Sequence, residues 1–143
     1  MTDPVPPSDA DLRALLRECR TLAVVGLSAD WNRPSHFAAK YMQQHGYRIL
    51  PVNPRYAGQR LLGQPCVAAL ADLQEPVDIV DVFRRTEDVM PVARGAVSIG
   101  ARCLWQQLGV RNLEADALVR RAGLISVTDR CLKVEHMRRL GHG

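Results

Sequence analysis

The most chemically informative part of the sequence is a polar loop that follows an apolar run. The loop reads GLSADWNRPS and begins at Gly26. A helix starting at Pro34 would present free N–H groups and a partial positive charge to an anion in this loop. The hydroxyls of Ser28 and Ser35 can donate to phosphate oxygens, and Arg33 adds a charged fork. These residues predict a phosphate site, although a capped helix with a solvated Arg33 also fits them.

The next apolar run ends in a second informative loop, VNPRY. NAD enzymes usually place a carboxylate at this point to bind the ribose diol, and here there is none. Asn53 can instead bond a sugar or a base, and Arg55 can meet an extra phosphate. The first loop also lacks the glycine fingerprint GxGxxG. The pattern favours a nucleotide phosphorylated on its ribose, so NADP and coenzyme A both remain open, and Arg55 as a surface arginine is the plain alternative.

Two further loops carry polar side chains after apolar runs. Arg84 and Arg85 follow the third run, and their alkyl stems can cover an adenine face, although we expect one of them to be only solvated. Gln107 and Gly109 follow the fourth run, in WQQLGV. The amide of Gln107 can hold a carbonyl-rich arm or simply face water.

Alternating apolar runs and helical patterns must position these loops. Strands are expected at 21–26, 47–54, 77–83, 102–107 and 124–128, and helices at 9–19, 34–46, 86–101, 112–123 and 130–140. Such alternation predicts an α/β fold, a Rossmann-like doubly wound parallel sheet of five strands with helices on both faces. We expect the strand order 3-2-1-4-5 and a ligand at the switch between strands 1 and 4.

The length and composition set the class of protein. The chain has 143 residues, which predicts one domain over 1–143, with 1–8 as a loose arm. The net charge of +4 is scattered and aromatics make up 5%, so we expect no nucleic acid partner. No apolar run approaches the ~20 residues of a membrane span, and no secretory signal opens the chain. A cytoplasmic protein is expected.

Reactive side chains are present but do not form a catalytic set. The four cysteines form no CxxC pair and fit no zinc pattern, so we expect free, mostly buried thiols and no metal site. Cys131 stands among charged neighbours, and a mixed disulfide with a ligand thiol is conceivable, although a buried thiol is preferred. His36 can contact a ligand or support helix packing. With no nucleophile, base and orienting acid in one group, we expect no catalytic residues and a ligand-binding protein rather than an enzyme.

Read together, several stretches resemble a known family. They are VVGLS, RPSHFAAKYMQQHGYRILPVNP, LLGQPC, VDIVDVFRR, WQQLGV and AGLISVTDRCLKVEH, in order from 21 to 136. The chain resembles the small stand-alone CoA-binding proteins of bacteria, single-domain relatives of the nucleotide-binding domain of the succinyl-CoA synthetase α subunit. The synthetase also has a phosphorylated-histidine domain and a partner subunit, for which 143 residues leave no room, so its reaction is not carried over.

The resemblance implies a place for each part of coenzyme A. It implies the pyrophosphate at Gly26, Leu27 and Ser28 and at the start of the next helix, with Arg33, Pro34, Ser35 and His36. It implies the adenosine and 3′-phosphate near Asn53, Pro54 and Arg55 and near Arg84 and Arg85, and the pantetheine arm toward Gln107 and Gly109. We therefore expect binding of coenzyme A or an acyl-CoA at the C-terminal edge of the sheet, without catalysis. The alternative is an NADP-dependent oxidoreductase or NADP-sensing domain, and a protein partner is left open.

Overall fold

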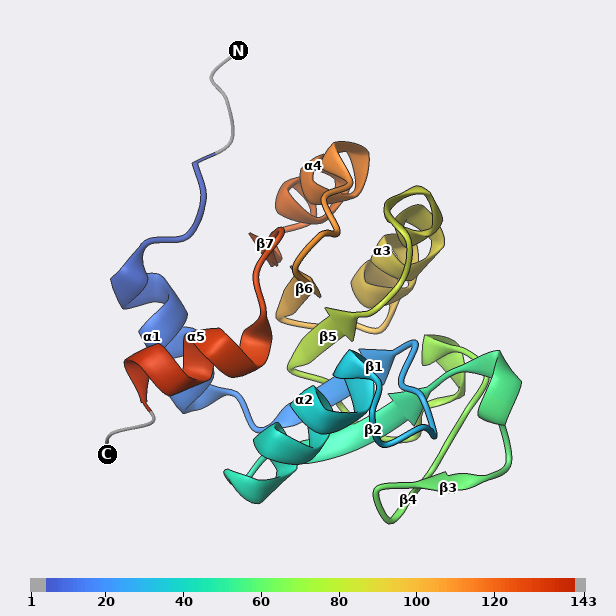
Figure 1. Cartoon of the computed structure of the whole chain (residues 1–143). Helices are drawn as coiled ribbons and strands as arrows, with labels where there is room; N and C mark the ends of the chain where they lie inside the picture. The colour runs from blue at the N-terminus through green and yellow to red at the C-terminus, as the bar shows by residue number, and fades with distance from the viewer. Residues whose placement is uncertain (1–4, 141–143) are drawn as a thin grey trace.

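A five-stranded parallel sheet forms the centre of the molecule (Figure 1). The computed structural model describes residues 5–140. The strands of the sheet are β1 (Thr21–Val25), β2 (Arg48–Val52), β5 (Ile79–Val82), β6 (Cys103–Gln106) and β7 (Ile125–Val127). Their spatial order is β2-β1-β5-β6-β7. This confirms the predicted α/β class and the doubly wound parallel sheet.

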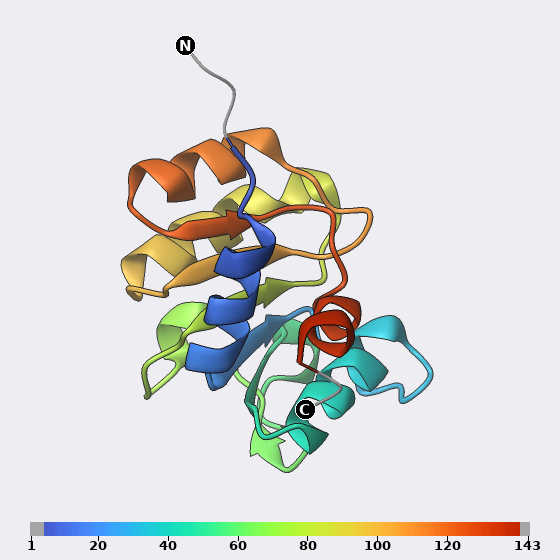
Figure 2. The same cartoon turned by 90° about the vertical axis from the view of Figure 1, so that its left-hand side faces the viewer.

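Helices cover both faces of the sheet, as Figures 1 and 2 show. The helices are α1 (Asp9–Glu18), α2 (Pro34–Gln44), α3 (Val89–Ser98), α4 (Leu113–Arg121) and α5 (Leu132–Arg139). Apolar side chains of α1, α2 and α5 form one core with one face of the sheet, and those of α3 and α4 form a second core with the other. The strands are buried on both sides, which explains their continuous apolar runs.

The predicted strand order was wrong in one respect. The third strand along the chain, β5, lies beside β1, so in the predicted numbering the order is 2-1-3-4-5 rather than 3-2-1-4-5. The reason is readable at Pro51, which lies within β2. Proline has no N–H to give to a strand on a second side, so it belongs on an edge. β2 is that edge strand, and beyond it only an isolated bridge joins Val52 to Val67.

The observed strand order shifts the switch point to lie between β1 and β5, but the four loops still lie together. The chain reverses its direction of winding between β1 and β5, not between the first and fourth strands. Because every strand of this sheet is parallel, the loops after β1, β2, β5 and β6 still leave the same edge. The loops after β1 and β5 are now direct neighbours, and those after β2 and β6 flank them.

Gly26 lies at this edge, directly after β1, where its backbone comes close to the backbone of Phe83 after β5. Its φ is +92°, and a Cβ at this position would lie 2.1 Å from the carbonyl oxygen of Phe83. Its N–H donates to the carbonyl of Val52 at 2.8 Å. A side chain at Gly26 would therefore strain the backbone before any ligand arrived.

Local signals mark the starts of three helices: Ser8 caps α1, Pro34 opens α2, as predicted, and Asn112 caps α4. Between β2 and β5 the chain forms short 3₁₀ turns and a small hairpin, β3 (Arg60–Leu61) with β4 (Gln64–Pro65).

The first described residue of the N-terminal arm contacts α4. Of the predicted loose arm 1–8, residues 1–4 lie outside the described part. The carbonyl of Val5 accepts a hydrogen bond from Arg120 Nη1 at 2.8 Å. Among the described helices, none has the length and apolar character needed to cross a membrane.

Candidate functional site

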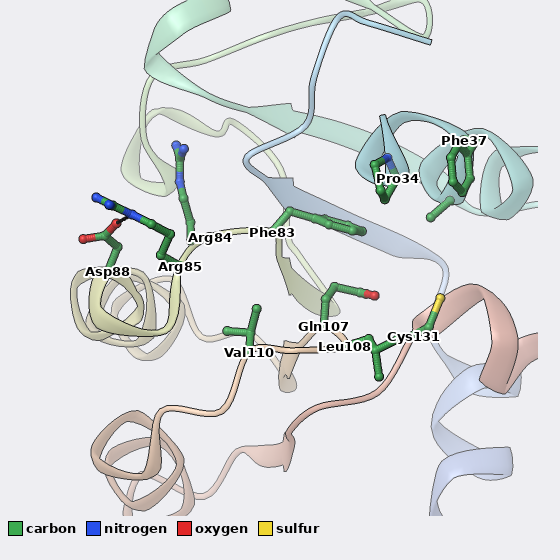
Figure 3. Close-up of a pocket in the computed structure, with 11 residues that line it drawn as sticks. Pro34, Phe37, Phe83, Arg84, Arg85, Asp88, Gln107, Leu108, Val110 and Cys131 are labelled. Atoms are coloured by element: carbon green, nitrogen blue, oxygen red, sulfur yellow. Dashed lines mark hydrogen bonds and ion pairs between the residues drawn. The ribbon is translucent and has the colours of Figure 1, made fainter. Parts of the chain in front are cut away.

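Two hollows that share a wall lie at the carboxyl edge of the sheet. The first, which we call the apolar groove, has a volume of about 750 Å³ and is lined by Pro34, Phe37, Ala38, Phe83, Arg84, Arg85, Asp88, Gln107, Leu108, Val110 and Cys131 (Figure 3). The second, the arginine hollow, has about 640 Å³ and is lined by Gly26, Ser28, Asp30, Arg33, Pro34, Ser35, Asn53, Pro54, Arg55, Tyr56, Phe83 and Arg84. Pro34, Phe83 and Arg84 belong to both.

Most of the residues predicted from the sequence line one of these hollows. The exceptions are Leu27, His36 and Gly109. The side chain of Leu27 is fully buried in the core, so only its backbone lies at the edge. Gly109 is exposed and its N–H donates to Asp129 Oδ1 at 2.7 Å. The structure thus brings together the first three predicted loops and, from the fourth, Gln107.

The arginine hollow carries positive charge that the protein itself does not neutralise. Within residues 5–140, no carboxylate forms an ion pair with Arg33, Arg55 or Arg84. Arg85 differs, because its exposed side chain pairs with Asp88 at 3.1 Å and Glu87 at 3.6 Å. Three unpaired guanidinium groups around one hollow suit a ligand with several negative charges.

The loop after β1 is held in place by its own hydrogen bonds. Ser28 N–H donates to Ser35 Oγ at 3.0 Å, and His36 Nδ1 lies 2.9 Å from the carbonyl oxygen of Ser28. His36 therefore holds the loop rather than lining a hollow. Ser28 Oγ accepts from Asp30 N–H at 3.0 Å, which leaves its hydroxyl proton free to donate.

The N-terminus of α2 faces this loop. The helix has no acidic residue in its first turn and no side-chain cap, although Asp30 of the loop lines the same hollow. Arg33 occupies the cap position and Pro34, which has no N–H, the first turn, and the N–H groups of His36 and Phe37 donate to the carbonyl of Arg33 at 3.0 and 3.2 Å. The N–H of Ser35 and the partial positive charge of the helix are thus available to a phosphate, in addition to the arginines.

Asn53 has a structural task that the sequence did not reveal. Its Nδ2 donates to the carbonyl of Leu27 at 3.0 Å, and its Oδ1 accepts from Arg55 N–H at 3.0 Å. The side chain is buried. It links the loop after β2 to the loop after β1, so it sets the shape of the arginine hollow instead of offering a free amide.

The apolar groove contains exposed apolar side chains. Phe37 of α2 is 45% exposed and lines the groove. Leu108 is 72% exposed on the opposite loop, and neither it nor Val110 was predicted as a site residue. Two large exposed apolar side chains beside one cavity suggest a partly apolar ligand.

Cys131 is the thiol of this groove. Cys19, Cys66 and Cys103 are buried, as expected, whereas Cys131 is half-buried and lines the cavity. Figure 3 shows Cys131 and Phe37 on one side of the groove and Arg84, Arg85 and Asp88 on the other. The cavity therefore has a charged end and an apolar end with a sulfur atom.

Gln107 forms part of the groove wall and is already hydrogen-bonded. Its Nε2 donates to the carboxylate of Asp81, and its Oε1 accepts from Leu132 N–H at 3.4 Å. Asp81 lies inside the sheet, and burial raises the pKa of its carboxyl to about 7 against the lowering effect of the Gln107 hydrogen bond. No group of three or more metal-ligating side chains occurs among residues 5–140.

A third, smaller hollow adjoins the arginine hollow on the α3 side of the sheet. This side slot has about 360 Å³ and is lined mainly by apolar residues: Val25, Val52, Pro54, Ala68, Ala69, Leu70, Ala71, Arg84, Asp88, Pro91, Val92 and Gly95. Pro54 and Arg84 line both hollows. A flat apolar ring could enter the slot while its polar substituents remained in the arginine hollow.

Comparison with known proteins identifies a family that this chain matches. The model of a family described as "CoA binding domain" matches residues 20–137. The uncharacterized protein YneT of Bacillus subtilis (strain 168) is 39% identical over 130 residues, which cover 91% of this chain and 95% of that protein. The predicted CoA-binding family is thereby confirmed.

Solved structures agree with the fold. The Thermus thermophilus protein cell-free ID.343 superimposes with a TM-score of 0.90 at 43% identity, over 93% of this chain and 99% of that one. A dinucleotide-forming acetyl-coenzyme A synthetase of Ca. Korarchaeum cryptofilum, solved with phosphate and ADP, gives a TM-score of 0.66 at 19% identity. That match covers 80% of this chain and 27% of the synthetase, and it shows a shared fold alone.

Proposed function

This chain belongs to the family of CoA-binding domains, and we propose that it binds coenzyme A or an acyl-CoA across the carboxyl edge of its sheet, without catalysing a reaction of its own. The observation that carries the proposal is the joined pair of hollows. One is positively charged and the other is apolar. Coenzyme A has the same division, because a triply phosphorylated adenosine continues into a largely uncharged pantetheine arm that ends in a thiol.

The pyrophosphate belongs in the arginine hollow, against the start of α2. There the Ser28 hydroxyl, the N–H of Ser35 and Arg33 all donate. Each hydrogen bond from a charged group contributes roughly 1.5–3 kcal/mol when water is displaced. The loop needs no GxGxxG fingerprint, because side chains supply donors that glycine-rich loops supply from the backbone.

The adenosine and its 3′-phosphate belong at Pro54, Arg55 and Arg84. The side slot, which Pro54 and Arg84 share with the arginine hollow, accepts the adenine ring between apolar side chains. Arg84 lines both the slot and the arginine hollow, and Arg55 lines the arginine hollow. Neither forms an ion pair within the described residues, so they are the donors to the 3′-phosphate. NADP carries its extra phosphate on the 2′ oxygen, so phosphate position is the chemical difference to test.

The pantetheine arm then follows the apolar groove. It passes Phe83 and Gln107, and its sulfur lies at the end formed by Phe37, Leu108 and Cys131. No nucleophile, base and orienting acid converge there among the side chains that line the groove, so the groove holds the thiol or thioester and does not transform it.

Isothermal titration with coenzyme A, dephospho-CoA and NADPH tests the proposal. We expect coenzyme A to bind about tenfold more tightly than dephospho-CoA, because the latter leaves a charged donor without its phosphate. NADPH should bind more weakly than both. Equal affinities for coenzyme A and dephospho-CoA would remove the role of Arg55 and Arg84. Binding of NADPH without binding of coenzyme A would overturn the proposal and favour an NADP-dependent protein.

A further inference from the structure

A carboxylate lies buried in the sheet beneath the binding edge. Asp81 is on β5, between Val24 of β1 and Trp105 of β6, and it is only 2% exposed. Because side chains alternate between the two faces of a strand, Asp81 lies on the same face of the sheet as Ile79, which belongs to the core under α1, α2 and α5. Burying a carboxylate at such a position costs free energy of folding unless a hydrogen-bond partner faces it. The proposed binding of coenzyme A does not by itself involve Asp81.

The partner of Asp81 is the amide of Gln107. The side chain of Gln107 is 4% exposed, and its Nε2 donates to the Asp81 carboxylate. Its Oε1 accepts from the backbone N–H of Leu132, the first residue of α5, at 3.4 Å. Two hydrogen bonds of opposite sense fix which end of the amide is oxygen and which is nitrogen.

The same amide completes the start of α5. Cys131 occupies the cap position of this helix and makes no side-chain cap bond. Gln107 therefore supplies an acceptor for the N–H of the first helical residue, which has no partner within the helix. A chain of contacts thus runs from the middle of the sheet, through Gln107, to the part of α5 that forms the thiol end of the groove.

Gln107 retains some hydrogen-bonding capacity for a ligand. A primary amide offers two N–H donors and two lone pairs, and Asp81 and Leu132 use one of each. Figure 3 shows the Gln107 side chain extending toward the side of the groove where Cys131 lies. The remaining N–H and lone pair suit the secondary amides of a pantetheine arm, which carry one donor and one acceptor each.

We propose that Asp81 is a positioning residue for the pantetheine arm: it holds the Gln107 amide in one orientation, and through Gln107 it holds the start of α5 against the groove. Asp81 does not touch the ligand. Its influence passes through Gln107 and the start of α5, neither of which lines the arginine hollow, so we expect it at the pantetheine end. This inference rests on the proposed binding of coenzyme A.

The test compares two ligands on four proteins. The ligands are coenzyme A and its nucleotide half, adenosine 3′-phosphate 5′-diphosphate, titrated into the wild type and into Asp81→Leu, Asp81→Asn and Gln107→Met. Leucine removes the acceptor at similar volume, asparagine keeps an acceptor oxygen, and methionine removes the amide from the other side.

The expected result is a difference between the two ligands. Asp81→Leu and Gln107→Met should each weaken coenzyme A about tenfold, the effect of one lost buried hydrogen bond, and change the nucleotide half less than about twofold. Asp81→Asn should retain coenzyme A affinity within about threefold, since its oxygen can still accept from Gln107. The double variant Asp81→Leu/Gln107→Met should be no weaker than either single variant, because both changes break one chain of contacts.

The outcomes separate this inference from the proposed function. If the wild type binds neither ligand, the proposed function fails, and the role of Asp81 fails with it. If the wild type binds both ligands but Asp81→Leu weakens them equally, or leaves coenzyme A unchanged, only the positioning role is overturned. Should Asp81→Leu fail to fold, the smaller variant Asp81→Ala, which also removes the acceptor, decides by the same comparison of ligands against Asp81→Asn.

Discussion

The arginine hollow and the apolar groove solve the problem of ligand recognition in different ways. The arginine hollow is lined by side chains from loops, and its charges are left without partners inside the protein. The apolar groove instead has a wall tied to the core, because Gln107 connects buried Asp81 to α5. The difference indicates that charge fixes affinity at one end, whereas packing and a fixed amide set the shape of the other.

The largest expected effect breaks the arginine hollow. The double variant Arg55→Ala/Arg84→Ala should weaken coenzyme A about a hundredfold, because two charged donors are lost. Titration calorimetry measures the change. Arg138→Ala is the matched control, since Arg138 is exposed and lines neither hollow, and it should shift the affinity less than about twofold. Equal losses in both proteins would mean that general charge, not this hollow, attracts the ligand.

A second prediction concerns Asp81, which is buried in the sheet beneath the apolar groove. Burial raises the pKa of Asp81 to about 7, so the folded protein retains a proton there that the unfolded chain releases near its ordinary pKa of 3.8. The protonated Asp81 therefore stabilises the folded state fully below pH 3.8. The free energy of unfolding of the wild type falls as the pH rises from about 4 to 7, because the unfolded chain loses this proton first.

Asp81→Asn removes this titration and keeps a similar shape. The free energy of unfolding of the variant, relative to the wild type, should rise by about 3 kcal/mol between pH 4 and pH 7 and then level off. Urea unfolding at several pH values measures it. A constant difference between the two proteins across this range would show that Asp81 does not carry a raised pKa.

Salt sharpens the contrast between the two hollows. Raising ionic strength from about 0.05 to about 0.5 M should weaken coenzyme A about tenfold in the wild type, since exposed charges are screened. In Arg55→Ala/Arg84→Ala the dependence should be much shallower, because less charge remains to be screened. A salt dependence that survives the double substitution would place the phosphates elsewhere.

The smallest effect is expected at the apolar end. Leu108→Ser removes an apolar side chain that is 72% exposed, so it should weaken coenzyme A about threefold and leave adenosine 3′-phosphate 5′-diphosphate unchanged. Leu113→Ser is the control, because Leu113 is also exposed, at 59%, but lies outside the groove lining. Comparable losses in both variants would remove the assigned role of Leu108.

The charged end was readable from the sequence, and the apolar end largely was not. Arginines and serines after apolar runs have few structural uses, so Arg33, Arg55 and Arg84 could be predicted as partners for phosphate. Apolar residues such as Phe37 and Leu108 look alike whether they enter a core or line a cavity. Only the packing of α2 and α5 shows which side of Phe37 is left open.

The fold was predictable to the level of its elements but not of their order. Alternating apolar and helical patterns fixed the strands, and parallel pairing then brought the loops to one edge. The position of β5 depended on Pro51, a single residue whose missing N–H makes β2 an edge strand. The roles of Asn53 and His36, which contact the backbone carbonyls of Leu27 and Ser28 in the loop after β1, could be seen only in the assembled loops.

The orientation of the ligand can be tested most directly at Cys131. Its thiol is half-buried in the apolar groove, whereas the other three cysteines are buried, so alkylation under reducing conditions reports on this end of the site. The rate can be followed by mass spectrometry of the Cys131 peptide with saturating acetyl-CoA, which has no free thiol to consume the alkylating agent, or with saturating adenosine 3′-phosphate 5′-diphosphate. We predict that acetyl-CoA slows the reaction strongly and that the nucleotide half leaves it unchanged. Equal protection by both ligands, or by neither, would contradict the placement of the pantetheine arm in the apolar groove.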